Sequence, residues 1–383
     1  MTGTTDHSDR PTVAPFKRRS FLASAALAAG APVAAAGPVQ AAVQATAQSE
    51  SGPAAAAGHQ SVARLLAVPE ESRRDDWLRA ALQVAVALEL STIPPYLCGW
   101  WSIRDRGSEA ARLIRRIVGD EMFHLGVVCN LLVAVGGRPR IREAAPTYPG
   151  PLPGGVHAGL TVYLSGLTKT FVHDVMMGIE APHRPLARSI DTSPSVGTFY
   201  SDILKTFRSV APELSARGQL STRIGSDVLE PVETPDDVER AIEIIKEQGE
   251  GTTSSPATAF DDDYPAHYYA FGEIYHGRRL RDNDGDWEFN GAPVRFPDAR
   301  PMAPVPAGGW PNPPGEVRRL LESFDTTYNS LLHTLESAWA GGGHRSLHAA
   351  IHIMRGLETP AVKLMERPIP DAPGNYGPQF RAF

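Results

Sequence analysis

A single carboxylate inside an apolar helix constrains the fold of this chain more than any other feature. Residues 81–97, ALQVAVALELSTIPPYL, offer almost no polar face, yet they contain Glu89. An ionised carboxylate taken out of water needs compensation, or it becomes neutral. Glu89 therefore predicts a fold that brings a cation, a metal ion or another acid to the middle of this helix.

The next apolar segment supplies suitable partners. Residues 114–137, IRRIVGDEMFHLGVVCNLLVAVGG, contain Glu121 and His124 on a stripe of apolar residues at helical spacing. Positions three apart share one face of a helix, so this carboxylate and this imidazole both point inward. A Glu on one helix and a Glu-x-x-His on the next are half of a carboxylate-bridged di-metal site in a four-helix bundle.

Such a site takes one Glu from each of two helices and a Glu-x-x-His from each of the other two. Glu180 ends the third predicted helix and supplies the second single Glu. Glu250 in QGEG and His267 in AHYYAF jointly replace the second Glu-x-x-His. The predicted set has four carboxylates and two imidazoles: Glu89, Glu121, His124, Glu180, Glu250 and His267.

Glu250 is the least regular member of this set. In a straight helix over residues 237–251 it falls nearly opposite the buried side, which is formed by Val238, Ala241, Ile242 and Ile245. Gly249 and Gly251 flank it, however, and glycine permits a backbone turn that would redirect it inward. The sequence leaves open a metal ligand or a solvated carboxylate at a helix end.

The other members also have simpler interpretations. Glu121 and His124 could form a buried hydrogen-bonded pair, and Glu89 could be paired with a nearby arginine. Glu180 could cap a loop, and His267 could be a core histidine with satisfied hydrogen bonds. The shared helical face and the apolar surroundings favour the metal site.

Three further polar groups have predicted roles outside the ligand set. His173 lies two turns before Glu180, where a core position is favoured over a hydrogen bond to the site. Glu273 and His276 sit beside basic residues and predict a solvated ion pair. The DNDGD segment, residues 282–286, resembles a calcium loop but lacks the later Glu, so it predicts a turn.

Helical periodicity recurs along the chain and no strand-like alternation is sustained, which predicts an all-α fold. Pro94-Pro95 should kink or interrupt the first helix and leave its second half as a separate short piece. Thr234 and Pro235, followed by two acids, are a strong helix start. The expected helices cover residues 75–103, 108–135, 164–180, 195–214, 237–251, 264–280, 316–338 and 345–365.

The first residues predict export. Residues 1–45 contain Arg18 and Arg19 before a mildly apolar, Ala-rich run, which is typical of a twin-arginine signal, and residues 46–60 have the composition of a linker. The run is too short and too weak to span a bilayer. The alternative is a disordered Ala-rich tail with a chance arginine pair. An extracellular, periplasmic or cell-envelope location follows from the first interpretation.

Charge and cysteine content exclude some functions. The net charge of -6 and the pI near 6.1, with no basic stripe among aromatics, argue against a nucleic-acid-binding surface. Cys98 and Cys129 both lie in predicted apolar helices, where they form either one disulfide or two separate buried thiols. Neither supports a cysteine metal centre.

Several sequence segments together resemble the ferritin-like domain of the iminophenyl-pyruvate dimer synthase family. They are LQVAVALELSTIPPYL, GDEMFHLGVVCNLLVAVGGRP, FVHDVMMGIEAP, VGTFYSDI, IKEQGEG, AHYYAFGEIYHGRRL and GPQF. The resemblance spans residues 62–383, and ELSTIPPY, EMFHL and QGEG are its most specific parts. It implies the same six metal residues. Some members couple two indole-pyruvate imines oxidatively, but those enzymes are much longer and this chain has an export signal, so the substrate is not carried over.

We therefore expect a ferritin-like four-helix bundle over residues 61–285 and a C-terminal extension, residues 286–383, with two helices packed on the bundle. Residues 138–160 and 281–315 are expected to form long Pro/Gly-rich loops that wall a pocket, with Tyr96 and Tyr268 lining it. The expected function is an exported non-haem di-iron oxidoreductase that uses O2 on a small organic molecule, an amino-acid-derived one being a candidate. Its cofactor would be two iron ions, with manganese as the alternative. A ferroxidase or iron-storage protein and a non-catalytic metal-binding bundle are the rival interpretations.

Overall fold

The computed structural model describes residues 61–182, 194–251, 256, 264–284 and 286–383. The predicted export signal and linker, residues 1–60, lie outside this part of the chain. The described residues form an all-α fold with a few short strands.

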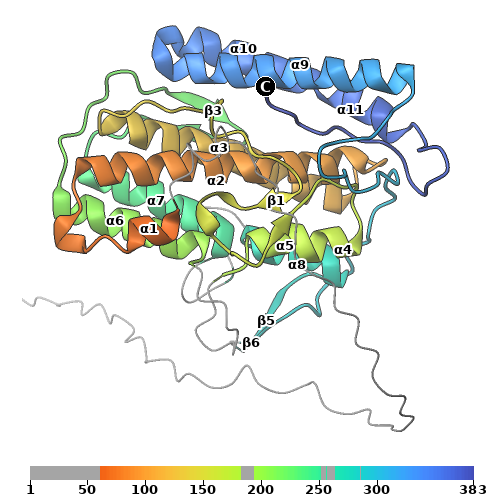
Figure 1. The fold of residues 1–383 in the computed structure, drawn as a ribbon. Helices are drawn as coiled ribbons and strands as arrows, with labels where there is room; N and C mark the ends of the chain where they lie inside the picture. Colours follow the sequence, from red (N-terminus) through yellow and green to blue (C-terminus); the bar gives the residue numbers. More distant parts are fainter. Residues whose placement is uncertain (1–60, 183–193, 252–255, 257–263, 285) are drawn as a thin grey trace, which may run out of the picture. The chain divides into compact units, whose positions relative to one another are not determined.

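The fold is built around two long antiparallel helices, α2 (Asp75–Ser102) and α3 (Glu109–Ala134), which pack along each other. A second layer lies below them in Figure 1. There α6 (Val196–Val210) packs on α7 (Pro235–Glu250) toward one end, and α5 (Met177–Ile179) packs on α8 (His267–His276) toward the other. The third and fourth positions of the bundle are thus each made of more than one helical piece.

Local sequence signals set the ends of these helices as predicted. The Ser108 side chain accepts a hydrogen bond from the backbone N–H of Ala111 and begins α3. Gly136, with a φ of 73°, follows its end. Thr234 and Asp237 form a reciprocal capping box at the start of α7. By contrast α6 ends at Val210, earlier than expected, because the next residue, Ala211, is left-handed and precedes a proline.

The expected break at Pro94-Pro95 is wrong, because α2 runs through both prolines as one helix. Pro95 has no N–H to give the carbonyl of Ser91, four residues earlier. The hydroxyl of Tyr148, from the loop after α3, donates to that carbonyl at 2.6 Å instead. A side chain distant in sequence therefore satisfies a backbone group that proline leaves free.

Tyr148→Phe is expected to reduce the free energy of unfolding by about 1 to 3 kcal/mol, because the buried Ser91 carbonyl loses its donor. Urea denaturation measures the loss. Pro95→Ala supplies an N–H to the same carbonyl, so the Tyr148→Phe substitution should cost much less in that background. An equal loss in both backgrounds would contradict this role for Tyr148.

The third predicted helix begins later than expected and is irregular. Its first residues pair with the chain after α8, since the N–H of Gly166 donates to the Met302 carbonyl at 3.2 Å. Thr168 then caps α4 (Lys169–Phe171), which continues into a π-helical turn, η3 (Val172–Met176), and α5. A π turn adds a residue to the helical repeat and so rotates every later side chain relative to the earlier ones.

Short strands pair as three antiparallel hairpins. These are β1 (Gly150–Pro151) with β2 (Thr161–Val162), β3 (Thr222–Ile224) with β4 (Asp227–Leu229), and β5 (Arg281–Asn283) with β6 (Asp286–Glu288). In the last hairpin Asp282 and Asn283 lie in β5, Asp284 is in a turn and Asp286 begins β6, so only part of the predicted turn is a turn. Short helical elements precede α2 and β2: α1 (Val62–Leu66), η1 (Glu70–Ser72) and η2 (Pro153–Gly155).

The C-terminal residues add a helical layer on the other side of α2 and α3 (Figure 1). This layer consists of α9 (Gly315–Ser337), the π-helical η4 (Ala338–Gly342), α10 (Gly343–Gly356) and α11 (Glu358–Met365). Residues 345–365, expected as one helix, are divided at Leu357 into α10 and α11.

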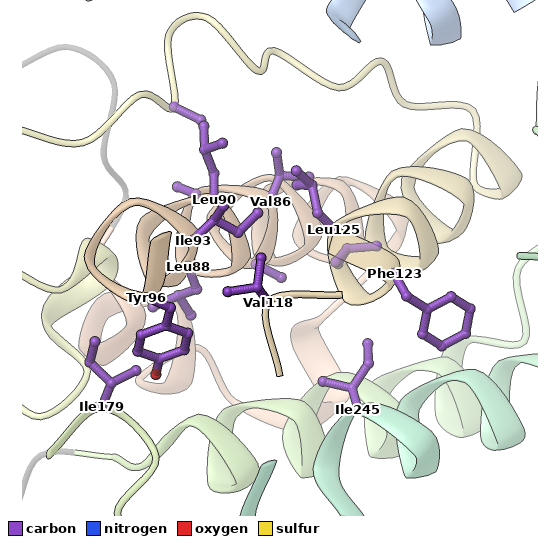
Figure 2. Packing of buried hydrophobic residues seen from close by; sticks show 14 of the residues in the cluster. Val86, Leu88, Leu90, Ile93, Tyr96, Val118, Phe123, Leu125, Ile179 and Ile245 are labelled. Atoms are coloured by element: carbon purple, nitrogen blue, oxygen red, sulfur yellow. The ribbon is translucent and has the colours of Figure 1, made fainter. Parts of the chain in front are cut away.

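The core lies between these layers. Figure 2 shows apolar side chains of α2 and α3, such as Leu88 and Phe123, with Ile179 and Ile245 from the second layer. By length and composition α2 and α3 are each apolar enough to cross a membrane, but 94% and 89% of their most apolar windows are buried inside the protein. Both therefore have the burial of core helices. Cys98 and Cys129 are buried within them as separate free thiols.

Candidate metal centre

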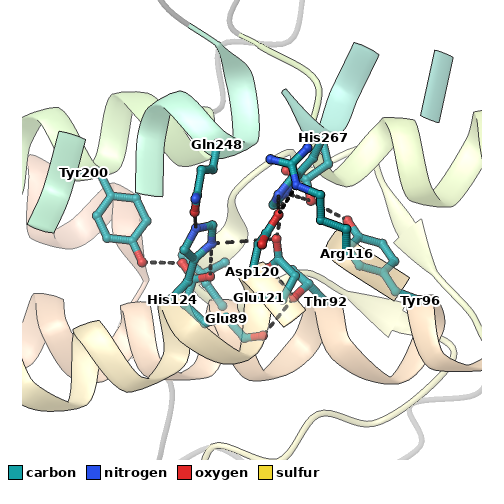
Figure 3. Close-up of polar contacts among 12 residues, drawn as sticks. Glu89, Thr92, Tyr96, Arg116, Asp120, Glu121, His124, Tyr200, Gln248 and His267 are labelled. Carbon is teal, nitrogen blue, oxygen red and sulfur yellow. Dashed lines mark hydrogen bonds and ion pairs between the residues drawn. The ribbon is translucent and has the colours of Figure 1, made fainter. Parts of the chain in front are cut away.

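Five of the six predicted ligand residues meet in the core of the bundle. Figure 3 labels four of them, Glu89, Glu121, His124 and His267. The five residues form two groups, and within each group the possible ligand atoms lie within 4.8 Å of one another. The first group is Glu89, Glu121 and His124, and the second is Glu121, Glu180 and His267. Glu121 belongs to both. All five side chains are buried, with exposed fractions from 0% to 8%.

Each residue reaches the centre from a different part of the fold. Glu89 lies in the middle of α2, and Glu121 and His124 are one turn apart on the facing side of α3. Glu180 directly follows α5, so the π turn of η3 sets its direction. His267 is the first residue of α8. The centre therefore depends on the packing of four helical segments.

Both imidazoles turn the same nitrogen toward the carboxylates. His124 Nδ1 lies 3.7 Å from an oxygen of Glu89 and 3.7 Å from an oxygen of Glu121. His267 Nδ1 lies 2.9 Å from Glu121 Oε1 and 3.6 Å from Glu180 Oε1. The contact of 2.9 Å between His267 Nδ1 and Glu121 Oε1 lacks hydrogen-bond geometry. Two ligands of the same metal ion lie close together in this way without a hydrogen bond between them. The two rings lie 5.7 Å apart.

The opposite nitrogen of each ring has its own partner. His124 Nε2 donates to the side-chain oxygen of Gln248 at 2.7 Å. His267 Nε2 donates to Asp120 Oδ2 at 3.2 Å. A histidine that binds a metal commonly gives its other N–H to a carboxylate or carbonyl, which fixes the tautomer and the ring orientation. In both histidines the proton of the neutral ring is on Nε2, where it is donated to the partner, so the lone pair of Nδ1 is available to bind a cation.

Hydroxyl groups hold the three carboxylates. The Thr92 hydroxyl donates to Glu121 Oε2 at 2.6 Å and the Tyr96 hydroxyl donates to Glu180 Oε1 at 2.6 Å. The Tyr200 hydroxyl donates to Glu89 Oε1. One oxygen of each carboxylate is thus oriented by the protein.

The electrostatics of the centre favour cations. Burial, and then repulsion by Glu121, raise the pKa of Glu89 well above its usual value. Burial alone would raise the pKa of Glu121, but the two histidines and Thr92 lower it overall. Burial would likewise lower the pKa of His267, but the carboxylates around it raise it well above its usual value. Both raised pKa values favour protonation of Glu89 and His267 where no metal is bound.

The donor set fits two divalent cations. Carboxylate oxygens together with imidazole nitrogens suit iron and manganese, whereas the thiolates that zinc and copper sites often use are absent from both groups. A shared carboxylate between two Glu/His groups is the arrangement of carboxylate-bridged sites in helical bundles. The residues present are thus those that a di-metal centre requires.

The cavity at the centre is small, about 30 Å³. This is about the volume that one water molecule occupies in the liquid. Apolar side chains form part of its wall, among them Leu88, Leu152, Ile179 and Ile245. Leu152 comes from the loop over residues 138–160, which was expected to wall a pocket. Tyr96 donates to Glu180 but does not line this cavity, and neither Tyr268 nor the described part of residues 281–315 lines it.

Glu250 lies at the rim of the cavity and in neither group. Its carboxylate accepts a hydrogen bond from the backbone N–H of Gly197 at 2.7 Å, in the first turn of α6. A side chain at Gly197 would collide with it, since a Cβ there would lie 2.5 Å from Glu250 Oε2. α7 is helical through Gly249 to Glu250, so no turn redirects this carboxylate. Here it serves as an anion at the positive end of a helix.

Two predictions about neighbouring groups are wrong. His173 is exposed and paired with Asp174 at 2.7 Å, because the π turn separates its face from that of Glu180. Glu273 is paired as expected, with Arg279 at 2.8 Å, but it is buried rather than solvated. The backbone N–H of Leu280 also donates to Glu273.

Four residues of the centre were missed from the sequence: Thr92, Asp120, Tyr200 and Gln248. Asp120 adjoins Glu121 in a helix whose buried face was taken to carry only the Glu-x-x-His pair. Gln248 lies in the same QGEG phrase as Glu250, and a polar residue on the predicted buried side of α7 was an available signal. Tyr200 had no signal, because α6 could not be placed against Glu89 without the packing.

Asp120→Asn is expected to weaken metal binding about 10-fold to 100-fold, because it removes the charge that orients His267. Anaerobic competition with a coloured chelator measures the affinity for ferrous iron. Asp325→Asn, which changes another buried carboxylate, in α9, is the control and should leave the affinity unchanged. A similar loss in both variants would show a general effect of removing a buried charge.

Comparison with known proteins agrees with this architecture. The ferritin-like family matches residues 82–276, which is about half of the 383 residues and includes all six predicted ligands. A similar solved structure is that of a ferritin-like protein from Caulobacter vibrioides, with 23% identity and a TM-score of 0.57 over 79% of this chain and 97% of that one. No curated protein matches the chain. With its fold, its buried Glu/His groups and this match, the chain belongs to the ferritin-like family.

Proposed function

We propose that this protein is an exported non-haem di-iron oxidoreductase that uses O2 to oxidise a small organic molecule. The observation that carries the proposal is the pair of buried Glu/His groups that share Glu121. Buried carboxylates in a helical core are costly unless cations compensate them. An exported protein that folds before it crosses the membrane would load such ions inside the cell.

The residues assign a ligand set to each ion. Glu89, Glu121 and His124 would hold one iron, and Glu121, Glu180 and His267 would hold the other, with manganese as the alternative metal. When bound, the two ferrous ions supply the electrons that reduce O2.

The protein's own side chains would position and protect this centre. Thr92, Tyr96 and Tyr200 each donate a hydrogen bond to one oxygen of a carboxylate. These bonds fix the orientation of each carboxylate, and its other oxygen would bind the metal. Apolar walls and a cavity the size of one water molecule exclude bulk water. A dry site protects reactive species from side reactions and strengthens the electrostatic effect of the fixed charges.

The substrate class rests on the finer resemblance to iminophenyl-pyruvate dimer synthases, which favours an amino-acid-derived molecule. Such a molecule exceeds a cavity of about 30 Å³. The loop that carries Leu152 closes one wall, so movement of that loop would enlarge the site. Leu152→Ala should therefore raise the rate with bulky substrates more than with small ones.

The size of the cavity favours a second candidate, a ferroxidase, because iron ions and O2 are small enough for a cavity of about 30 Å³. A ferroxidase of the storage type takes up iron well beyond two ions per chain and assembles into a shell. The proposed oxidase binds about two ions per chain and forms no shell.

Anaerobic loading with ferrous iron, followed by O2 and size-exclusion chromatography, separates the candidates. The oxidase should bind about two irons per chain and consume more O2 when reductant and a suitable organic substrate are added. Continued iron uptake in a large assembly would favour the ferroxidase. Less than about one iron per chain would favour a non-catalytic bundle.

Export is proposed from the sequence alone, since residues 1–60 lie outside the described residues. Changing Arg18 and Arg19 together to lysine should leave the protein in the cytoplasmic fraction, because the twin-arginine route requires the arginine pair. Cell fractionation with an antibody measures this. Equal export of the double variant would exclude this route.

A further inference from the structure

A second cavity lies between the bundle and the C-terminal helices. Its volume is about 240 Å³. It shares no lining residue with the cavity at the metal centre. Apolar side chains make up most of its wall: Leu90, Ile93 and Leu97 of α2, Leu125 of α3, Leu332 of α9 and Leu347 of α10. We refer to it as the C-terminal cavity.

The charge of its wall has one sign. Arg223 of β3 and Arg355 of α10 line the C-terminal cavity, and no Asp or Glu does. Both arginines are exposed, whereas the apolar residues of α2 are buried, so the charges lie at the rim. The chain as a whole has a net charge of -6. Two positive groups without a carboxylate therefore distinguish this rim and favour an anion.

We propose that the C-terminal cavity binds an aliphatic carboxylate of about eight carbons, of the size of octanoate. The chain would lie against the leucine side chains, and the carboxylate would lie at the rim, where Arg223 and Arg355 attract it. The size follows from the volume, because a cavity of about 150 Å³ holds one benzene molecule and this cavity is larger.

Titration of the purified mature protein with sodium octanoate tests the proposal. Trp339 lines the C-terminal cavity, so its fluorescence reports binding, and calorimetry gives the stoichiometry. One octanoate should bind per chain. Butanoate should bind at least tenfold more weakly, because each methylene that is lost reduces affinity about fourfold. Octan-1-ol should also bind about tenfold more weakly, because it lacks the charge.

Two variants locate the ligand. Arg223→Ala with Arg355→Ala should weaken octanoate binding at least tenfold, and both residues are exposed, so the fold should be unaffected. Arg345→Ala, an exposed arginine of α10 outside the cavity, is the control and should bind normally.

The proposal is overturned if octanoate does not bind, if octan-1-ol binds as tightly, or if the arginine double variant binds like the control. Metal content serves as the check on folding, because the C-terminal cavity and the metal centre have no residue in common. Failure of the proposed oxidase function would leave octanoate binding unchanged, so the two proposals are tested separately.

Discussion

Glu121→Ala is expected to abolish binding of both metal ions, from about two per chain to nearly none, and with them the consumption of O2. Glu121 is the residue that the two Glu/His groups share, so its loss removes a ligand from each. Elemental analysis after anaerobic loading measures the ions, and an oxygen electrode measures the reaction. The change in activity should be the largest of any single substitution.

Two neighbouring carboxylates provide the matched comparison. Glu89→Gln and Glu180→Gln each remove a ligand from only one group, so each variant should retain about one ion per chain. Glu250→Gln should retain both, because Glu250 contacts the backbone of α6 and belongs to neither group. Full metal content in Glu121→Ala would refute the centre as described.

Phe271→Ala is expected to reduce the free energy of unfolding by about 3 to 5 kcal/mol, the usual cost of deleting a buried phenyl ring. Phe271 is fully buried on α8, and its ring lies 5.0 Å from that of Tyr96, the residue that holds Glu180. The cavity created by the substitution would therefore also loosen one wall of the metal centre. Chemical denaturation measures the stability.

Phe383→Ala is the control, because the side chain of Phe383 is 78% exposed and its truncation should change stability by no more than about 0.5 kcal/mol. Phe271→Leu fills part of the space and should lose less than Phe271→Ala. A small effect of Phe271→Ala would show that the packing between α8 and α2 contributes little to stability.

The ligands on regular helices could be predicted from the sequence. Glu121 and His124 lie one turn apart in a continuous α-helix, so periodicity alone places them on one face. Glu89 could be predicted because a carboxylate in an apolar helix requires a partner. His267, Phe271 and Ile274 likewise share the buried face of α8 as their spacing predicts. Regular geometry makes such inferences reliable.

Residues whose side chains are placed by an irregular stretch of backbone could not be predicted in the same way. Helical periodicity misplaced His173, because a π turn follows no fixed sequence signal and changes which residues share a face. Proline chemistry predicted a break in α2, but the hydroxyl that replaces the lost hydrogen bond comes from Tyr148, 57 positions away. Contacts between distant segments decide such cases, and single-sequence patterns do not contain them.

Glu250 shows a related limit. Flanking glycines indicated that the backbone could turn this carboxylate inward, yet the helix continues and the N–H of Gly197 binds it instead. Gln248, two residues earlier, is the side chain of this phrase that contacts a predicted ligand. A sequence motif shared with a family can therefore identify a functional segment correctly without showing which of its residues contacts the site.

The two histidines differ in what lies behind them, and this makes the two halves of the centre unequal. A neutral amide supports His124, whereas a carboxylate supports His267. A negatively charged neighbour makes an imidazole a stronger electron donor, so the ion beside His267 would be easier to oxidise and would fill first. Stepwise loading, with distinct spectroscopic signals for the first and second equivalents, is the expected signature of this asymmetry.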